Sequence, residues 1–461
     1  MQESEHPSDA DSQSRHWRWT VVVAIAAVLA VVLVVAVTLH VRRQQADSPN
    51  VTGAAEHGAT VKPDSGDRSN SASALPDLPF SLSGVSYNAE LVEVSEGADP
   101  AQLADSWTFG GDFSRIGSFP IDSTHVFGSA SPDPNNLNAY YAAILDRDGG
   151  VQALDTPSDP FYEPQDGTAD GNWAVWRSAT LSGSSAQLVY DNWRVQAWDA
   201  KTGTTVTLGA ASDINGRDDT PALGGDIVPT ANQSTAFFAS NIANGDHWTP
   251  SVLAFPLAGG SHTVIDEGNY PAAVADGVIY AGDAQQADDS TGFPAYATLK
   301  RSVGAQGAAS GAGDAVFEVK SSSDAAQSKT QSADSEQGQW GIAGVWAHEG
   351  YRAVAFYNGN VESGTYIGFW ADDFQRPLVW VHVQSPSVVA SMNSEWFVWG
   401  AGSQSENTGM YAFNWSKGEI TYLGSCYGYS RPTIASDNNT VMVPSLPDNA
   451  QAVSFTVGTL H

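Results

Sequence analysis

The sequence predicts an all-β protein of the β-propeller class, preceded by one transmembrane helix and a polar linker. From residue 79 onward, short runs of β-branched and aromatic residues are bounded by Gly, Asn, Asp and Pro, with no long stretch of helical periodicity. A glycine-marked hairpin recurs along this part, and an apolar strand recurs upstream of each hairpin. The 15 Trp, 15 Tyr, 17 Phe and 44 Gly suit a large aromatic core with many turns.

Composition excludes several classes of function. The chain has 51 acidic and only 20 basic residues, a formal net charge of −31, which disfavours nucleic-acid binding because phosphates require a cationic face. Its single cysteine, Cys426, excludes an internal disulfide and a multi-thiolate metal cluster. The sequence contains no GxSxG, HExxH, Walker or CxxC motif, so it predicts no catalytic residue, cofactor or metal site.

A single apolar segment dominates the N-terminal part. Residues 20–39 carry no charge, and at about 1.5 Å per residue they form a helix of about 30 Å, the thickness of one bilayer core. A cleavable signal peptide has a shorter apolar run that ends in small residues, whereas this run is followed by Arg42 and Arg43. We therefore expect an uncleaved, single-pass anchor in the cell membrane, preceded by a short polar tail over residues 1–19.

The orientation of this anchor is not fixed by charge, because Arg15 and Arg18 before it match Arg42 and Arg43 after it. Long domains translocate largely irrespective of charge, so we expect a cytoplasmic tail and a C-terminal domain outside the cell, with the opposite topology as the alternative. Residues 40–78 are rich in Ser, Ala, Gly, Asp and Pro, and predict a disordered linker to the domain at 79–461. A similar low-complexity insert lies at residues 321–338.

The hairpin repeat predicts the blades of the propeller. In each good copy a turn former stands four positions before a glycine and a strand follows; the copies are 144–150, 197–203, 254–260 and 412–418. Weaker copies lie at 300–304, 371–375 and 454–458. The copies are separated by 40 to 71 residues, and the longest interval contains the low-complexity insert. This spacing is typical of four-stranded propeller blades.

The apolar strands support a count of seven blades. They occupy residues 124–127, 173–176, 235–238, 278–280, 353–356, 396–399 and 440–443. Each is apolar on both faces, as expected for a strand between two neighbouring blades. The last repeat ends after its third strand, so we expect residues 90–94 to supply the fourth and to close the ring. Six blades with an extra hairpin, or a pair of β-sandwiches, are the alternatives.

A family resemblance follows from one of these hairpins. Residues 197–203 resemble the Asp-x-x-Thr-Gly turn of pyrroloquinoline-quinone-type and TolB-like propeller repeats, and residues 164–176 are similar to the strand entry of such repeats. The resemblance implies a propeller fold. The apolar segment at 20–39 adds the expectation of a membrane anchor, and the low Lys and high Ala content that of a bacterial protein. The resemblance does not imply quinone binding, because Leu208 stands where the quinoprotein repeat has its closing Trp.

A ligand site is expected in the long connections between second and third strands, at 129–139, 177–193, 240–250 and 283–294. Aromatic and charged side chains are mixed there: Asp191, Trp193, Arg194, His247, Trp248, Asp288 and Asp289. Such a mixture suits a polar protein partner or a glycan that stacks on indoles. The alternative is that these residues are solvated loop positions and partly buried tryptophans.

Two functions remain open at this point. The first is a membrane-tethered, non-catalytic module with a monomeric ectodomain that binds or scaffolds a protein or an envelope glycan. The second is an extracytoplasmic hydrolase or quinone-dependent enzyme whose polar residues converge on a central channel. Clustered carboxylates with perturbed pKa values in an enclosed pocket would favour the enzyme.

Overall fold

The computed structural model describes residues 78–461 except 95–98, 113, 132–139, 156–162, 185–186, 218–219, 221–222, 224–227, 246, 286–294, 305–310, 322–338, 372, 430 and 447–451. Contacts divide the chain into a unit of residues 58–183 and 188–461, treated below, and a unit of residues 1–57 and 184–187. The predicted tail, transmembrane helix, linker and insert fall outside the described residues, apart from Leu78 and Ser321. Among the residues described, no helix is long and apolar enough to cross a bilayer.

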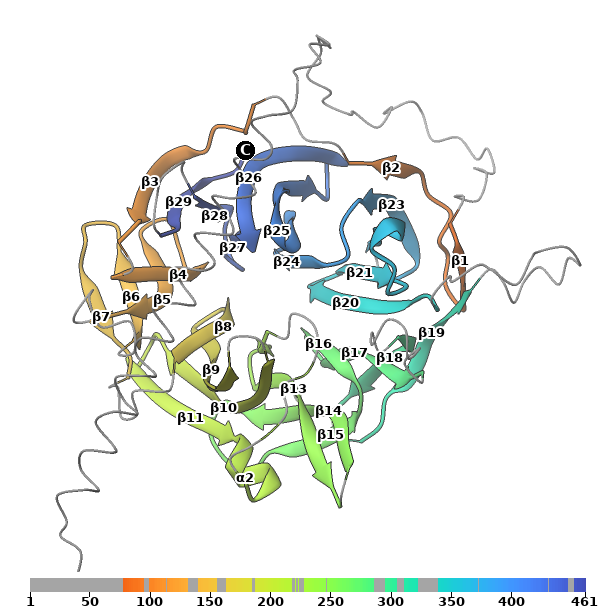
Figure 1. The fold of residues 1–461 in the computed structure, drawn as a ribbon, viewed down its shortest axis with the longest axis horizontal. Coiled ribbons are helices and arrows are strands. Elements are labelled where there is room, and N and C mark those ends of the chain that lie inside the picture. Colours follow the sequence, from red (N-terminus) through yellow and green to blue (C-terminus); the bar gives the residue numbers. More distant parts are fainter. Residues whose placement is uncertain are drawn as a thin grey trace, which may run out of the picture. The chain divides into compact units, whose positions relative to one another are not determined.

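Antiparallel sheets stand around a central axis, which confirms the all-β propeller (Figure 1). Five sheets are separate. The first contains β4 (Arg115–Pro120), β5 (His125–Ala130), β6 (Tyr141–Asp146) and β7 (Val151–Ala153), and the second contains β8 (Glu163–Asp170), β9 (Trp173–Ser184), β10 (Gln187–Asp199) and β11 (Thr204–Ala210). The third contains β12 (Thr230–Ala231), β13 (Thr235–Asn244), β14 (His247–Pro256) and β15 (Thr263–Glu267), and the fourth contains β24 (Val388–Met392), β25 (Trp396–Asn414) and β26 (Glu419–Tyr429). The fifth contains β27 (Thr433–Ile434), β28 (Thr440–Ser445), β29 (Ser454–Thr459) and, from the start of the domain, β3 (Ala104–Gly110).

The sixth sheet has ten strands, so the prediction of seven separate blades is not met. It contains two four-stranded meanders: β16 (Asn269–Val274), β17 (Gly277–Ala284), β18 (Tyr296–Val303) and β19 (Asp314–Ser321); then β20 (Gly341–His348), β21 (Tyr351–Tyr357), β22 (Thr365–Ala371) and β23 (Arg376–Val383). A single pairing between Tyr296 and Ile342 joins the two meanders. The remaining two strands, β1 (Phe80–Ser83) and β2 (Leu91–Glu93), lie on their outer edges.

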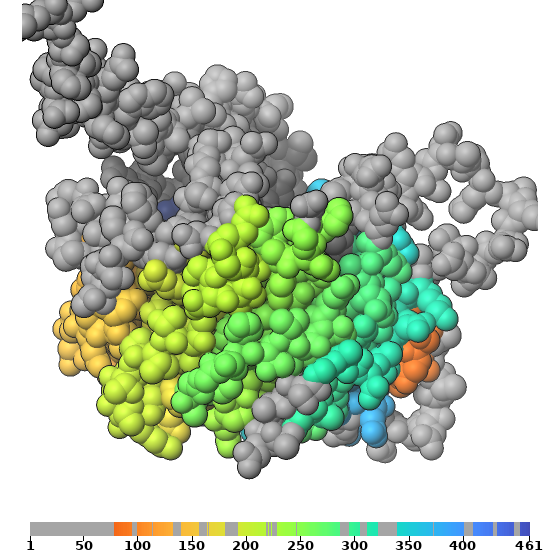
Figure 2. Space-filling model, turned by 90° about the horizontal axis from the view of Figure 1, so that it is seen from below, coloured from red at the N-terminus to blue at the C-terminus, as the bar shows by residue number. Residues whose placement is uncertain are grey.

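The apolar markers all lie where the sequence predicts them, in the second strand of each meander: β5, β9, β13, β17, β21, β25 and β28. Most of their side chains are almost fully buried because both faces of a sheet pack against neighbouring sheets, whereas Thr124, His125 and Trp173 at the strand starts are only partly buried. Phe127 of β5, for example, stacks on Phe119 of β4 with ring centroids 4.7 Å apart and lies 4.9 Å from Trp176 of the next sheet. Figure 2 shows, from the rim, that the sheets pack side by side.

The glycine hairpins are confirmed in the good copies. Gly203 and Gly418 both have φ of 68°, a left-handed conformation that glycine adopts without a Cβ clash. The Asp199 carboxylate accepts hydrogen bonds from the Lys201 N–H and the Thr202 hydroxyl, which fixes the first of these turns. The last copy is wrong, because residues 454–458 lie within strand β29 rather than in a hairpin.

An N-terminal strap, which we define as residues 78–110, adds three strands to two sheets along the outer rim (Figure 1). β1 pairs antiparallel with β19, β2 pairs parallel with β23, and β3 pairs antiparallel with β29. The chain start therefore closes the last sheet, as predicted, but with residues 104–110 instead of 90–94. The reason is packing: Phe109 of β3 stacks on Phe455 of β29 at 5.3 Å, whereas Val92 of β2 packs against the core beneath β23.

Candidate functional site

A central cavity of about 1200 Å³ lies where the first strands of the meanders meet. Its wall comes from six meanders and consists of residues 167–173, 230–234, 270–276, 343–349, 388–392 and 431–437 in part. The first strand of each meander is innermost, so the turn that follows it stands in an equivalent place around the axis. These first turns bring residues that are far apart in the sequence to one end of the cavity.

Asparagine side chains hold several of these turns in place. Asn393 accepts hydrogen bonds at Oδ1 from the N–H groups of Glu395 and Trp396, at 2.9 and 2.7 Å. Its Nδ2 donates to the carbonyl oxygens of Ala435 and Asn438 in the next sheet, at 3.0 and 2.8 Å. One side chain thus shapes its own turn and ties it to the neighbouring sheet.

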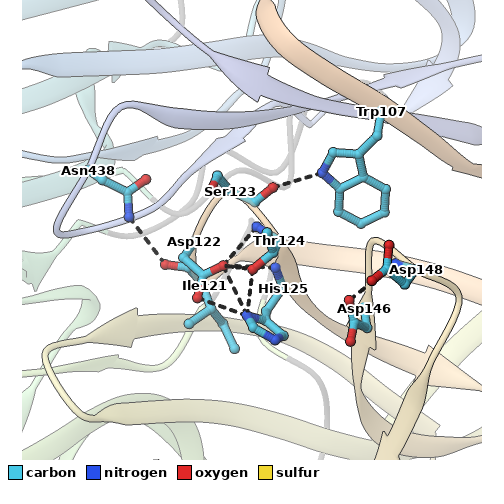
Figure 3. A network of polar contacts seen from close by, with 9 residues as sticks. All are labelled: Trp107, Ile121, Asp122, Ser123, Thr124, His125, Asp146, Asp148 and Asn438. Carbon is cyan, nitrogen blue, oxygen red and sulfur yellow. Dashed lines mark hydrogen bonds and ion pairs between the residues drawn. The ribbon is translucent and has the colours of Figure 1, made fainter.

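The same arrangement closes the ring between the last and the first sheets (Figure 3). Asn438 accepts at Oδ1 from the Thr440 N–H and donates from Nδ2 to the Ile121 carbonyl, at 3.5 Å. Asp122, next to Ile121, accepts from the N–H groups of Thr124 and His125 and from the His125 ring. Burial acts to raise the pKa of Asp122, but these hydrogen bonds outweigh it and hold the pKa below its usual value.

Two carboxylates stand at the cavity end of these turns. Asp170 ends β8, and Asp437 lies in the turn between β27 and β28, on the wall of the same cavity. Burial, reinforced by the nearby negative charge of Asp437, raises the pKa of Asp170 to about 6. Asp437 itself is exposed. Near neutral pH the Asp170 carboxyl group therefore takes up or releases a proton readily.

A histidine from a third sheet joins these carboxylates. His348 ends β20 and lines the cavity. Burial lowers its pKa, although Glu349 and Asp437 act in the opposite direction. The adjoining turn holds Glu349 at a φ of 48°, and Arg352 donates to the Glu349 and Tyr351 carbonyl oxygens at 2.5 and 2.7 Å. The His348 ring is therefore neutral at pH 7 and can accept or donate one hydrogen bond.

The arginines on or beside the wall already have acidic partners. Arg431 lies 2.5 Å from Asp166, which also lies 3.9 Å from Arg177. Asp276, at the turn after β16, binds Arg301 at 2.9 Å. Of these arginines only Arg431 lines the cavity itself, and Lys201 is a second cation on its wall.

Two half-exposed tryptophans complete the wall. Trp173 begins β9, directly after the Asp170 turn. Trp346 lies on β20, two residues before His348, and packs edge-to-face on Phe397 with centroids 5.5 Å apart. The Trp346 ring covers Gly344, where an added Cβ would come within 2.3 Å of the indole. The cavity therefore offers carboxylates, one neutral imidazole and apolar aromatic surface together.

The residues predicted from the sequence as a ligand site lie elsewhere. None of Trp193, Arg194, His247 and Trp248 lines the cavity, and the side chain of Asp191 is outside the described part of the structure. Asp288 and Asp289 fall outside the described residues.

The two predicted tryptophans differ sharply in exposure. Trp193 is only 1% exposed, donates from Nε1 to the Ser240 hydroxyl at 2.6 Å, and packs edge-to-face on Phe238. Its indole is a core group and is not available to stack on a ligand. Trp248 is half-buried at the outer end of β14, beside exposed His247, with the Arg217 guanidinium 5.4 Å from its ring centre.

Two of the connections expected to be loops are mostly strand. Residues 177–193 belong largely to β9 and β10, and residues 240–250 to β13 and β14, because these hairpins continue their ladders almost to the turn. Residues 131–140 and 285–295 do connect strands, though most of them lie outside the described part of the chain.

Sequence reasoning missed Asp170, His348 and Asp437. A signal was available, because each lies in the short turn directly before an apolar marker strand. The sequence-based prediction places ligand binding in the long connections, whereas these residues lie at short turns.

The comparisons with known proteins concern the fold only. No protein-family model and no curated protein matches the chain. Similar solved structures include an uncharacterised protein from Listeria monocytogenes EGD-e, with 8% identity and a TM-score of 0.40 over 77% of this chain and 91% of that one. TolB from Acinetobacter baumannii has 13% identity and a TM-score of 0.35 over 70% and 66%. An oligogalacturonate lyase from Vibrio parahaemolyticus has 8% identity and a TM-score of 0.45 over 83% and 99%.

The predicted resemblance is confirmed at the level of fold. The sheets form the propeller that the repeat implies, and TolB and the propeller domain of a protease from Pyrococcus furiosus are among the similar structures.

Proposed function

We propose that this protein is a membrane-anchored, extracytoplasmic binding module that captures part of a protein or envelope polymer in its central cavity. Residues 20–39 serve as the anchor and residues 40–78 give the domain reach. The ten-stranded sheet counts as two blades in this proposal, so that the ring has seven.

The cavity is the observation that carries the proposal. A volume of about 1200 Å³ exceeds most small-molecule pockets and suits a polymer segment. Carboxylates, an imidazole and two indoles from different sheets converge on it, and such a mixture gives both affinity and orientation to a polar ligand.

Blocking the cavity tests this function. Ala275 is an exposed residue of the cavity wall, and Ala275→Trp fills part of the space. Ala258 is an exposed residue of the β14–β15 turn away from the wall, so Ala258→Trp is the matched control. We expect envelope partners captured by the full-length chain to be lost with Ala275→Trp and kept with Ala258→Trp, with equal melting temperatures. Capture that survives Ala275→Trp unchanged would place the binding site elsewhere.

The location of the domain is tested separately. Protease treatment of intact cells should remove the C-terminal domain and leave the anchor. Protection of residues 78–461 in intact cells would contradict the proposed topology.

A hydrolase is the second candidate, favoured by one observation. The pKa of Asp170 is raised to about 6 beside exposed Asp437. A carboxyl group whose pKa lies near neutral pH is suited to general acid or general base catalysis. If the protein hydrolyses a captured polymer, Asp170→Asn should abolish turnover even at polymer concentrations that saturate the variant. Turnover that is unchanged in Asp170→Asn would remove this candidate.

A further inference from the structure

The cavity carries one inference about the chemistry of its ligand, which rests on the proposed binding function. We infer that the ligand is cationic: a lysine- or arginine-rich peptide segment that places an ammonium or guanidinium group between Asp170 and Asp437.

The first step is the balance of unpaired charge. Within the part of the chain that the structure describes, the wall residues Asp276 and Arg431 form ion pairs, whereas Asp170, Glu349, Asp437 and Lys201 form none, so three carboxylates stand against one ammonium group. Asp437 is close enough to Asp170 to raise its pKa, so the two carboxyl groups repel each other across the cavity. A cation between them relieves this repulsion and gains attraction from both.

The second step is the aromatic surface. Trp173 follows Asp170 by three residues and Trp346 precedes His348 by two, and both indoles are half-exposed on the same wall. The face of an indole attracts ammonium and guanidinium groups, and it packs on the methylene stem of lysine or arginine. An acidic polymer would meet the same carboxylates and would be repelled.

The third step separates an organic cation from a metal ion. The described residues contain no group of three or more His, Cys, Asp or Glu side chains arranged to hold a metal. Divalent cations such as calcium need six or more oxygen ligands, whereas an ammonium group needs only two or three acceptors. The size of the cavity also favours a peptide segment over a small amine.

A cationic peptide bound between these carboxylates should be released from the cavity at acidic pH. Asp437 is the charged group that acts on the pKa of Asp170, and His348, Glu349, Lys201 and Arg431 lie on the wall of the same cavity. As the pH falls through about 6, Asp170 becomes neutral and removes one attracting charge. Burial keeps the pKa of His348 low, so protonation of its ring at lower pH adds a repelling charge. Both changes weaken cation binding in the same direction.

The experiment measures binding of fluorescein-labelled pentalysine by anisotropy, using the full-length chain in a non-ionic detergent at physiological salt. We expect Asp170→Asn and Asp437→Asn each to weaken binding at least fivefold at pH 7.5, and Asp170→Asn to flatten the pH dependence between pH 7 and 5. Asp148→Asn is the matched control, because it removes the same charge from an exposed turn that is not part of the wall. It should change binding less than twofold.

The outcomes separate the inference from the proposed function. Equal weakening by Asp148→Asn and Asp170→Asn would show attraction to the whole acidic surface and would overturn the inference. Binding of fully acetylated pentalysine in preference to the charged peptide, still blocked by Ala275→Trp, would also overturn it and leave the binding function intact. Failure of Ala275→Trp to affect either peptide would contradict both.

Discussion

Replacing Asn393 by alanine should weaken the whole ring, because one buried side chain serves two sheets. Asn393 is 2% exposed and makes four hydrogen bonds, two to its own turn and two to carbonyl groups of the next sheet. Alanine removes all four hydrogen bonds, and the N–H groups of Glu395 and Trp396 lose the Asn393 oxygen as their acceptor. A typical internal hydrogen bond contributes about 1 kcal/mol, and a buried donor left unpaired costs more. We therefore expect the free energy of unfolding to fall by about 3–5 kcal/mol.

Urea denaturation followed by tryptophan fluorescence measures this loss as a lower midpoint at constant slope. Asn360 is the control, because its side chain caps only its own short helix through the Glu362 N–H. Asn360→Ala should cost about 1 kcal/mol or less. Asn393→Asp keeps the acceptor but places an anion against two carbonyl oxygens, so it should lose the tie between sheets. A loss below 1 kcal/mol in Asn393→Ala, or one equal to that of Asn360→Ala, would refute the reasoning.

Three further predictions concern the cavity, the core and the strap. The pKa of Asp170 is raised from its usual value of 3.8 to about 6 in the folded protein, so between these pH values the folded state binds one proton more than the unfolded state. The free energy of unfolding therefore rises as the pH falls through this window. In urea denaturation, Asp170→Asn should stabilise the protein by about 2 kcal/mol at pH 7.5 and by little at pH 4. A destabilised Asp170→Asn at pH 7.5 would contradict the assigned burial. Trp193→Ala should cost about 3–5 kcal/mol, whereas Trp248→Ala at the half-exposed hairpin end should cost about 1 kcal/mol; similar midpoints for both would be inconsistent with the burial of Trp193. The His382 ring stacks on Tyr366 with centroids 4.4 Å apart and lies 2.7 Å from the carboxylate of Glu93 in β2. His382→Ala should therefore speed amide hydrogen exchange in β2 and leave exchange in β28 unchanged. Glu93→Gln should have a smaller effect on exchange in β2, because the Glu93 side chain is 71% exposed. Unchanged exchange in β2 would show that backbone pairing alone holds the strap.

The periodic features of the fold were predictable because they follow from local chemistry. The strand at 396–399 must be apolar on both faces to lie between two sheets, and Gly418 must adopt a positive φ to close its hairpin. Both requirements act within a few residues, so both appear in the sequence as a repeat.

The positions that failed depend on contacts between distant segments. Residues 90–94 and 104–110 both read as short strands, and only the fit of Phe109 against Phe455 decides which of them completes the last sheet. The exposure of Trp193 similarly depends on Ser240 and Phe238 in another sheet.

The candidate site was missed for a related reason. Asp170 looks like an ordinary turn residue, as do Asp122 and Asn232 before their own strands. Its chemistry arises only when Asp437, more than 260 residues later, is brought beside it and water is partly excluded. No local pattern records such an encounter.

The strap sets an order on how the molecule can be completed during synthesis. Its three strands leave the ribosome first, yet their partners begin at residues 314, 376 and 454. β1 must therefore wait for over two hundred residues, and β3 for over three hundred, before its partner strand exists. Contacts so distant in sequence are slow to form, and unpaired strand edges are prone to aggregate in the meantime. The nascent chain consequently docks these strands in succession, and β3 joins only after β29 has been made.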